Sequence, residues 1–123
     1  MIFSWFVVIA WAGLIFYLSS IPSLNSGFGV WDFFLRKAAH VVEYAVLTGL
    51  LARAWRKTSA ALTVTGILAL SGLFALLYAI SDEIHQAYVP GRGPSAVDVA
   101  VDACGIIAAL YVAKFKMQNP HDN

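Results

Sequence analysis

The chain of 123 residues is 60% hydrophobic and only 12% charged, with a mean hydropathy of +0.75. Soluble domains carry about 25% charged residues, so the composition excludes a soluble domain and places the chain in a lipid bilayer. The formal net charge of +1, with no long basic run, gives no sign of nucleic-acid binding, and we expect no nucleic-acid partner. The single cysteine, Cys104, excludes an internal disulfide.

The first predicted span covers residues 2–20, IFSWFVVIAWAGLIFYLSS, and no charged residue precedes Asp32. A signal peptide would need a basic segment before its apolar run, so we expect a retained transmembrane helix. Residues 21–29, IPSLNSGFG, are rich in Pro, Ser, Asn and Gly and predict a loop. The second predicted span, residues 33–54, is weaker because its first half contains four ionisable residues. These are Arg36, Lys37, His40 and Glu43.

The third predicted span, residues 59–81, is uncharged, whereas the fourth, residues 95–114, contains Asp98 and Asp102. The chain shows none of the alternating pattern of a membrane β-barrel. Backbone groups in lipid must be satisfied within each segment, which favours helices. We therefore predict an all-α fold, an integral membrane four-helix transmembrane bundle that forms a single domain over residues 1–123.

Basic residues near the span ends predict the orientation, because lysine and arginine accumulate on the cytoplasmic side. Five lie on the side of the loop between the second and third spans: Arg53, Arg56, Lys57, Lys114 and Lys116. The opposite side has three: Arg36, Lys37 and Arg92. An even number of spans puts both termini on the more basic side, so we expect both termini in the cytoplasm.

Six of the seven acidic residues fall at or just below the non-cytoplasmic face in this topology. They are Asp32, Glu43, Asp82, Glu83, Asp98 and Asp102. Ionisable groups inside a span are costly and normally face the bundle interior or one another. The positions of Asp32 and Lys37 are explained if their side chains reach the membrane surface and anchor the helix end. Such anchoring does not explain Glu43, Asp98 or Asp102, whose short side chains lie at least one turn inside their spans.

These polar residues follow helical spacing, in which positions three, four and seven apart share a face. In the second span Arg36, His40 and Glu43 form one stripe, with Lys37 and Tyr44 on its flank. At the end of the third span the stripe is Asp82, Glu83 and Gln86, and in the fourth span it is Ser95, Asp98, Asp102 and Gly105. We predict that the three stripes converge on an outward-facing polar pocket. The predicted ligand-binding residues are Arg36, Lys37, His40, Glu43, Tyr44, Asp82, Glu83, Gln86, Arg92, Ser95, Asp98 and Asp102.

The motifs RKAAHVVEYAVLTGLL and SDEIHQAYVPGRGPSAVDVAVDACG, together with FYLSS and a following proline, resemble the VanZ-like membrane proteins. That family pattern combines Lys-x-x-His-x-x-x-Tyr, Asp-Glu-x-x-Gln, Pro-x-Arg and an Asp three residues after a small polar residue. The resemblance covers nearly the whole chain, with Asp102 in place of the expected Asn. It implies a bacterial cytoplasmic-membrane protein, and its namesake is linked to resistance to teicoplanin, a lipid-tailed glycopeptide antibiotic.

Arg92 lies in VPGRGPS, a loop with two glycines and two prolines. The planar fork of arginine suits phosphate or carboxylate recognition. With Arg36 and Lys37 nearby, we expect the pocket to bind an anionic cell-envelope lipid or a lipid-tailed glycopeptide. The alternative is that Arg92 pairs internally with Asp82, Glu83 or Asp98 and only locks the loop to the bundle.

Two histidines beside carboxylates, His40 with Glu43 and His85 with Glu83, also allow an enzyme that acts on a lipid-linked phosphate by acid/base chemistry. The candidates for catalysis are His40, Glu43, Asp82 and Glu83, with Arg92 stabilising charge. No serine or cysteine nucleophile stands out, and His85 is only two residues from Glu83, so the sequence leaves catalysis open.

Three other roles remain. Nitrogen and oxygen ligands for zinc or manganese could come from His40, Glu43, Asp82, Glu83 and His85. The spacings His-x-x-Glu and Asp-Glu-x-His are no specific metal-ligand signature, and hydrogen-bonded pairs explain them as well, so the sequence assigns neither metal ligands nor a cofactor. A chain of acids and histidines could relay protons in a carrier, which would need a dimer. A structural role is the last alternative, since small residues of the third span allow close packing within the chain or in a homo-oligomer.

Overall fold

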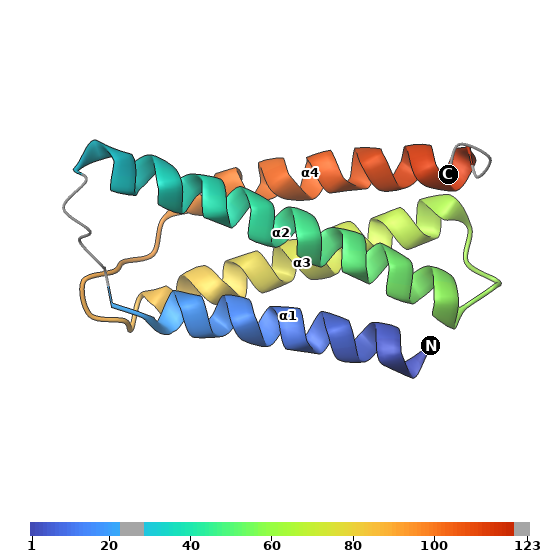
Figure 1. Cartoon of the computed structure of the whole chain (residues 1–123), viewed down its shortest axis with the longest axis horizontal. Coiled ribbons are helices and arrows are strands. Elements are labelled where there is room, and N and C mark those ends of the chain that lie inside the picture. The colour runs from blue at the N-terminus through green and yellow to red at the C-terminus, as the bar shows by residue number, and fades with distance from the viewer. Residues whose placement is uncertain (23–28, 120–123) are drawn as a thin grey trace.

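The computed structural model describes residues 1–22 and 29–119, in which all regular structure is helical. The helices are α1 (Ile2–Ser20), α2 (Val30–Thr58), α3 (Val64–Gln86) and α4 (Ala96–Gln118). Consecutive helices run in opposite directions along the long axis of the molecule, so the start of α1 and the end of α4 lie at the same end (Figure 1). The predicted all-α bundle of four helices is confirmed. Most of the predicted loop at residues 21–29 lies outside the described residues.

α3 begins five residues later than the hydropathy of the third span predicts. Thr63 is its N-cap, and its side-chain oxygen accepts a hydrogen bond from the amide of Gly66 at 3.1 Å. Such a hydroxyl cap satisfies a backbone donor that the first helical turn leaves without a partner. The helix then continues to Gln86, so the polar segment SDEIHQ forms its last turns.

Three helices, α1, α3 and α4, are long and apolar enough to cross a membrane, with hydropathies of 2.0, 2.0 and 1.9. α2 is not among them, because it carries the charged stripe and a basic C-terminal turn. Its 29 residues nevertheless rise about 44 Å, which exceeds the ~30 Å hydrocarbon core of a bilayer. Large apolar side chains such as Phe3, Phe6 and Ile9 point outward from α1, as expected of a helix that contacts lipid.

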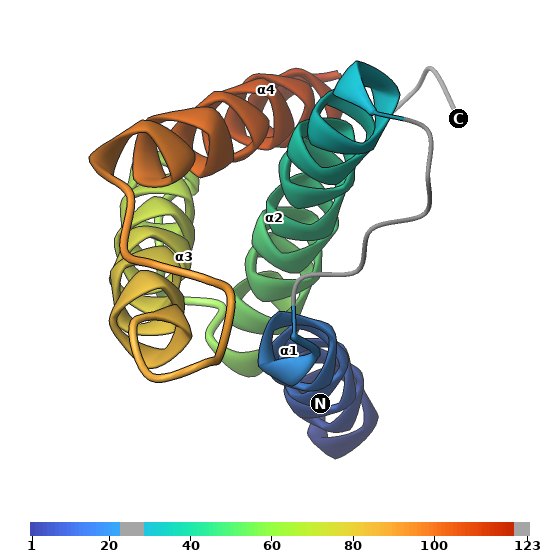
Figure 2. The same cartoon turned by 90° about the vertical axis from the view of Figure 1, so that its left-hand side faces the viewer.

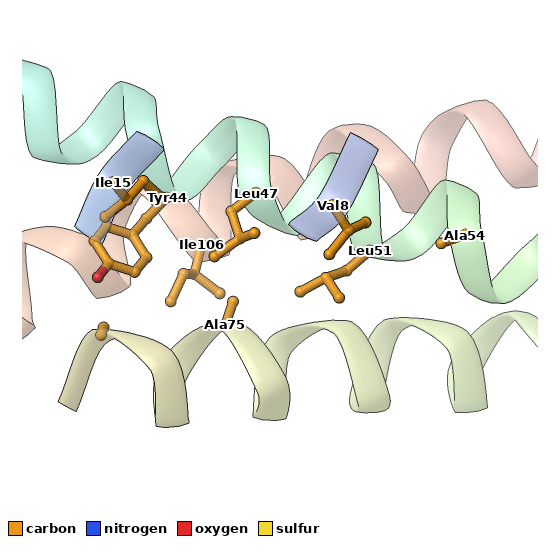
Figure 3. Close-up of a cluster of buried hydrophobic side chains, with 9 residues drawn as sticks. Val8, Ile15, Tyr44, Leu47, Leu51, Ala54, Ala75 and Ile106 are labelled. Carbon is orange, nitrogen blue, oxygen red and sulfur yellow. The ribbon is translucent and has the colours of Figure 1, made fainter. Parts of the chain in front are cut away.

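The bundle interior contains a core of buried apolar side chains from all four helices (Figure 3). Its members are Val8, Ile15, Tyr44, Leu47, Leu51, Ala54, Ala75, Ala79 and Ile106. Many of the residues on α3 are small, which lets the neighbouring backbones approach closely. Apart from Tyr44, the polar residues of the three stripes lie outside this core, toward the end of the bundle at which α3 ends and α2 and α4 begin.

Among the described glycines, Gly105 of α4 comes closest to the backbone of a neighbouring helix, which is α2. A Cβ atom at Gly105 would lie 2.3 Å from the carbonyl oxygen of Val41, which is much shorter than a van der Waals contact. Glycine is therefore the residue that lets α4 pack against α2 at this depth. Gly105 is three residues from Asp102, so the same approach brings that carboxylate to α2.

Gly105→Ala is expected to destabilise the bundle by about 1–3 kcal/mol, because the added methyl group must push two backbones apart. The measurement is the free energy of unfolding in mixed detergent micelles. Gly49→Ala is the matched control, since a Cβ atom at Gly49 meets nothing within 4 Å. Equal stability of the two alanine variants would contradict the close-packing role of Gly105.

Candidate functional site

The three polar stripes meet at one end of the bundle, which we call the pocket end. It comprises the C-terminal turns of α1 and α3, the N-terminal turns of α2 and α4, and the loop 87–95 between α3 and α4. Figure 2 views the molecule from this end, where that loop leaves α3, extends toward α1 and turns back to the start of α4. The sequence predicted stripes on α2, α3 and α4, and the structure adds α1 to them.

His40 of α2 pairs with Asp102 of α4, its Nδ1 atom lying 3.0 Å from Oδ1 of the carboxylate. The side chain of Asp102 is completely buried, whereas that of His40 retains 15% exposure. The sequence suggested Glu43 as the partner of His40. That pairing is not the one observed, because Gly105 lets α4 approach α2 and brings Asp102 closer. The Glu43 side chain lines a cavity instead.

Asp82 lies at the centre of a hydrogen-bonded cluster that joins α1 to α3. Its Oδ2 atom accepts a hydrogen bond from the Ser19 hydroxyl at 2.7 Å and another from the Gln86 amide at 3.0 Å. All three residues are at most 4% exposed. Sequence reasoning missed Ser19 as a site residue. Its only signal was a hydroxyl in the last turn of an apolar span, within the motif FYLSS.

Glu83 ties the end of α3 to the start of α4. Its Oε2 atom accepts a hydrogen bond from the backbone amide of Ser95 at 2.9 Å, while the Ser95 hydroxyl caps α4 by accepting from the amide of Asp98 at 3.2 Å. The second suggested pair, His85 with Glu83, does not form. His85 instead stacks on Phe16 of α1, with ring centroids 4.3 Å apart.

The basic residues Lys37 and Arg92 of the pocket end differ in whether an acidic side chain pairs with them. Lys37 forms an ion pair with Asp98 and lies over the ring of Phe33, 5.1 Å from its centroid. Its charge therefore stabilises contact between α2 and α4. By contrast, the Arg92 guanidinium has neither an ion pair nor a hydrogen bond with any residue in 1–22 or 29–119, and its Nε atom is shielded from solvent.

The predicted internal partners of Arg92 therefore make other contacts. Asp82 accepts from Ser19 and Gln86, Glu83 accepts from Ser95, and Asp98 pairs with Lys37. Within the described part of the chain, the alternative in which Arg92 only locks its loop by an internal ion pair is not observed.

Two cavities adjoin Arg92. The larger, of about 480 Å³, is lined by Leu18, Ser19, Ile21, Asp32, Leu35, Arg36, Ala39, His40, Glu43 and Arg92. The smaller, of about 220 Å³, is lined by Phe33, Arg36, Lys37, His40, Gln86, Gly91, Arg92, Gly93 and Asp98. Both share Arg36, His40 and Arg92, so the two cavities adjoin one another, with shared basic side chains between them and a mainly apolar wall in the larger one.

Five predicted ligand-binding residues line neither cavity: Tyr44, Asp82, Glu83, Ser95 and Asp102. Tyr44 is fully buried at the end of the apolar core (Figure 3), and its hydroxyl has no hydrogen-bond partner among the residues described. The acids lie behind the cavity walls. His40, Glu83 and Asp102 each place one metal-ligating atom within 4.8 Å of the others.

The family model described as VanZ/LLP1 matches residues 3–117, which include every residue of the pocket end named above. Comparisons with curated proteins and with solved structures give no match. The match covers nearly the whole chain and confirms the family that the sequence motifs predicted. This membrane-helix bundle therefore belongs to the VanZ/LLP1 family.

Proposed function

We propose that this protein lies in the bacterial cytoplasmic membrane and binds an anionic amphiphile in an outward-facing pocket. The ligand is a cell-envelope lipid with a phosphate or carboxylate headgroup, or a lipid-tailed glycopeptide of the teicoplanin type. Both carry a negative group and an alkyl tail in the same molecule. The observation that carries this proposal is the half-buried Arg92 guanidinium, which forms no hydrogen bond or ion pair with the described residues.

A cation held partly out of water without a directly paired counterion is costly, and Glu43 lines the same cavity without forming an ion pair or hydrogen bond with Arg92. An anionic ligand that pairs with Arg92 would explain its placement. Arginine offers several donors in a rigid plane and binds phosphate or carboxylate oxygens through two parallel hydrogen bonds. The surrounding backbone supports this placement, because Gly91 adopts a positive φ of 76° that a side chain rarely tolerates. The turn thus fixes Arg92 above the two cavities.

The larger cavity has the composition expected for an amphiphile. Leu18, Ile21 and Leu35 form an apolar wall, while Arg36 and Arg92 supply positive charge. Its volume of about 480 Å³ lies within the usual range for small-molecule sites. A headgroup would occupy this volume, and its tail would follow the apolar outer surfaces of α1 and α2.

The proposed orientation has both termini in the cytoplasm. The start of α1 and the end of α4 lie at the end of the bundle opposite the loop between α3 and α4 (Figure 1), near the basic C-terminal turn of α2. In a Cys104→Ser background, a cysteine in place of Tyr88, which is 83% exposed, is expected to react with an impermeant maleimide added to intact cells. A cysteine in place of Lys57 should react only after permeabilisation. The reverse pattern would contradict an outward-facing pocket.

The ligand class is tested by native mass spectrometry of the protein released from bacterial membranes in mild detergent. We expect bound anionic lipid at a higher fraction than in the membrane of origin. For the glycopeptide arm, teicoplanin should bind in preference to a glycopeptide that lacks a lipid tail. A bound-lipid composition equal to that of the membrane, together with no glycopeptide preference, would refute the proposal.

A second candidate function rests on the His40–Asp102 pair. A histidine oriented by a buried carboxylate is suited to act as a general base, here on a lipid-linked phosphate held by Arg92. Release of inorganic phosphate from such a lipid separates the two functions. If the protein hydrolyses the lipid-linked phosphate, His40→Gln should abolish the release of inorganic phosphate while the lipid remains bound. A protein that only binds the lipid should release no phosphate.

A further inference from the structure

We propose that His40, Glu83 and Asp102 form a binding site for a divalent transition-metal ion, Zn²⁺ or Mn²⁺, at the base of the pocket. The three residues come from α2, α3 and α4, and one ligand atom of each lies within 4.8 Å of the other two. Sequence spacing could not show this group, because more than forty positions separate His40 from either acid. The proposal deepens the proposed function, since the same pocket would use the metal.

Two buried oxygen atoms give an independent reason for a cation. Glu83 is 4% exposed and Asp102 is 0% exposed. Oε1 of Glu83 and Oδ2 of Asp102 are both shielded from solvent without a hydrogen-bond partner among the residues described. Buried polar atoms in native proteins are almost always partnered, and the requirement is stricter inside a bilayer. A metal ion at this position would satisfy both carboxylates.

The donor set decides the class of metal. One imidazole nitrogen and two carboxylates suit Zn²⁺ and Mn²⁺, whereas Mg²⁺ and Ca²⁺ favour oxygen ligands throughout. Zinc binds such ligands at about 2.0–2.2 Å, so the three atoms would move together by roughly 1 Å on loading. Three protein ligands leave a coordination position open to water or to an oxygen of the bound headgroup.

The charge balance of the pocket end supports the same conclusion. Six acidic residues lie there against three basic ones, Arg36, Lys37 and Arg92, and Lys37 pairs with Asp98. An anionic headgroup would meet an excess of negative charge. A divalent cation on Glu83 and Asp102 would neutralise two carboxylates and let Arg36 and Arg92 attract the ligand.

The experiment uses the whole chain in detergent, stripped with a chelator and then titrated with Zn²⁺ and Mn²⁺ by calorimetry. We expect stoichiometric uptake of one of these ions, verified by elemental analysis. Glu83→Gln and Asp102→Asn keep the shape of the side chains but remove a ligand charge, and each should weaken binding at least about tenfold. His40→Gln should do the same, whereas the matched control His85→Gln should bind as the native chain does.

A folded native chain that takes up no stoichiometric Zn²⁺ or Mn²⁺ overturns the proposal, whatever the variants do. Binding that persists unchanged in the Glu83→Gln/Asp102→Asn double variant overturns it as well. Co²⁺ absorption of the native chain gives a second measurement that needs no variant, because an imidazole ligand alters the visible bands. Binding of an anionic amphiphile in excess chelator, without any metal uptake, would refute the metal site and leave the proposed function standing. Metal uptake without a preference for anionic amphiphiles would support the metal site and refute the proposed function.

Discussion

Arg92→Gln is expected to weaken binding of an anionic amphiphile by about tenfold to a hundredfold. Glutamine keeps a polar side chain of moderate length but removes the charge and the paired donors. A hydrogen bond to a charged group contributes about 1.5–3 kcal/mol, and each 1.4 kcal/mol changes a dissociation constant about tenfold. Arg92 has no internal ion pair among the described residues, so the loss should appear in binding more than in stability. Titration of the purified protein with farnesyl phosphate measures it.

Two further variants decide what Arg92 contributes. Arg92→Lys retains the charge but lacks the planar fork, so its affinity should fall between those of the native chain and Arg92→Gln. Arg56→Gln is the matched control, because Arg56 is exposed in the last turn of α2 at the opposite end of the bundle. Native affinity in Arg92→Gln, or an equal loss in Arg56→Gln, would show that Arg92 does not bind the headgroup.

His40→Leu is expected to destabilise the protein by about 3–5 kcal/mol. The substitution removes the hydrogen-bond partner of Asp102, whose side chain is completely buried. Removing one member of a buried pair leaves an uncompensated polar or charged group, which costs much more than the pair contributes to stability. The measurement is reversible unfolding in mixed detergent micelles, with chelator present so that metal loss does not enter the comparison.

The double variant His40→Leu/Asp102→Leu tests the reason for that loss. Replacing both members of a buried pair by apolar residues is often neutral or stabilising. We therefore expect the double variant to regain most of the stability that His40→Leu loses. If the double variant is as unstable as the single one, the cause is disturbed packing between α2 and α4 rather than an unpaired Asp102.

The sequence predicted the convergence of the polar stripes well, because helical spacing fixes which residues of one helix share a face. Arg36, His40 and Glu43 do face the cavities, and Asp102 does reach α2. Spacing along one helix carries no information about how near another helix lies. The choice of Asp102 over Glu43 as the partner of His40 depends on the backbone contact at Gly105, which only the three-dimensional packing shows.

Two other features were beyond the sequence for comparable reasons. Ser19 lies in an apolar span where a lone hydroxyl is unremarkable, and its contact with Asp82 joins residues 63 positions apart. The start of α3 was set by hydropathy in the prediction, but the side chain of Thr63 caps the helix later in the chain. The apolar segment begins before the helix does, so the predicted first residue of the third helix was wrong.

Binding of farnesyl phosphate compared with farnesol tests the central claim most directly, because the two compounds share one tail and differ only in the anionic headgroup. The purified protein is titrated with each compound in the same neutral detergent. We predict that the phosphate binds at least about tenfold more tightly, and that this preference disappears in Arg92→Gln. Equal affinity for the phosphate and the alcohol in the native chain would contradict an anion-binding pocket.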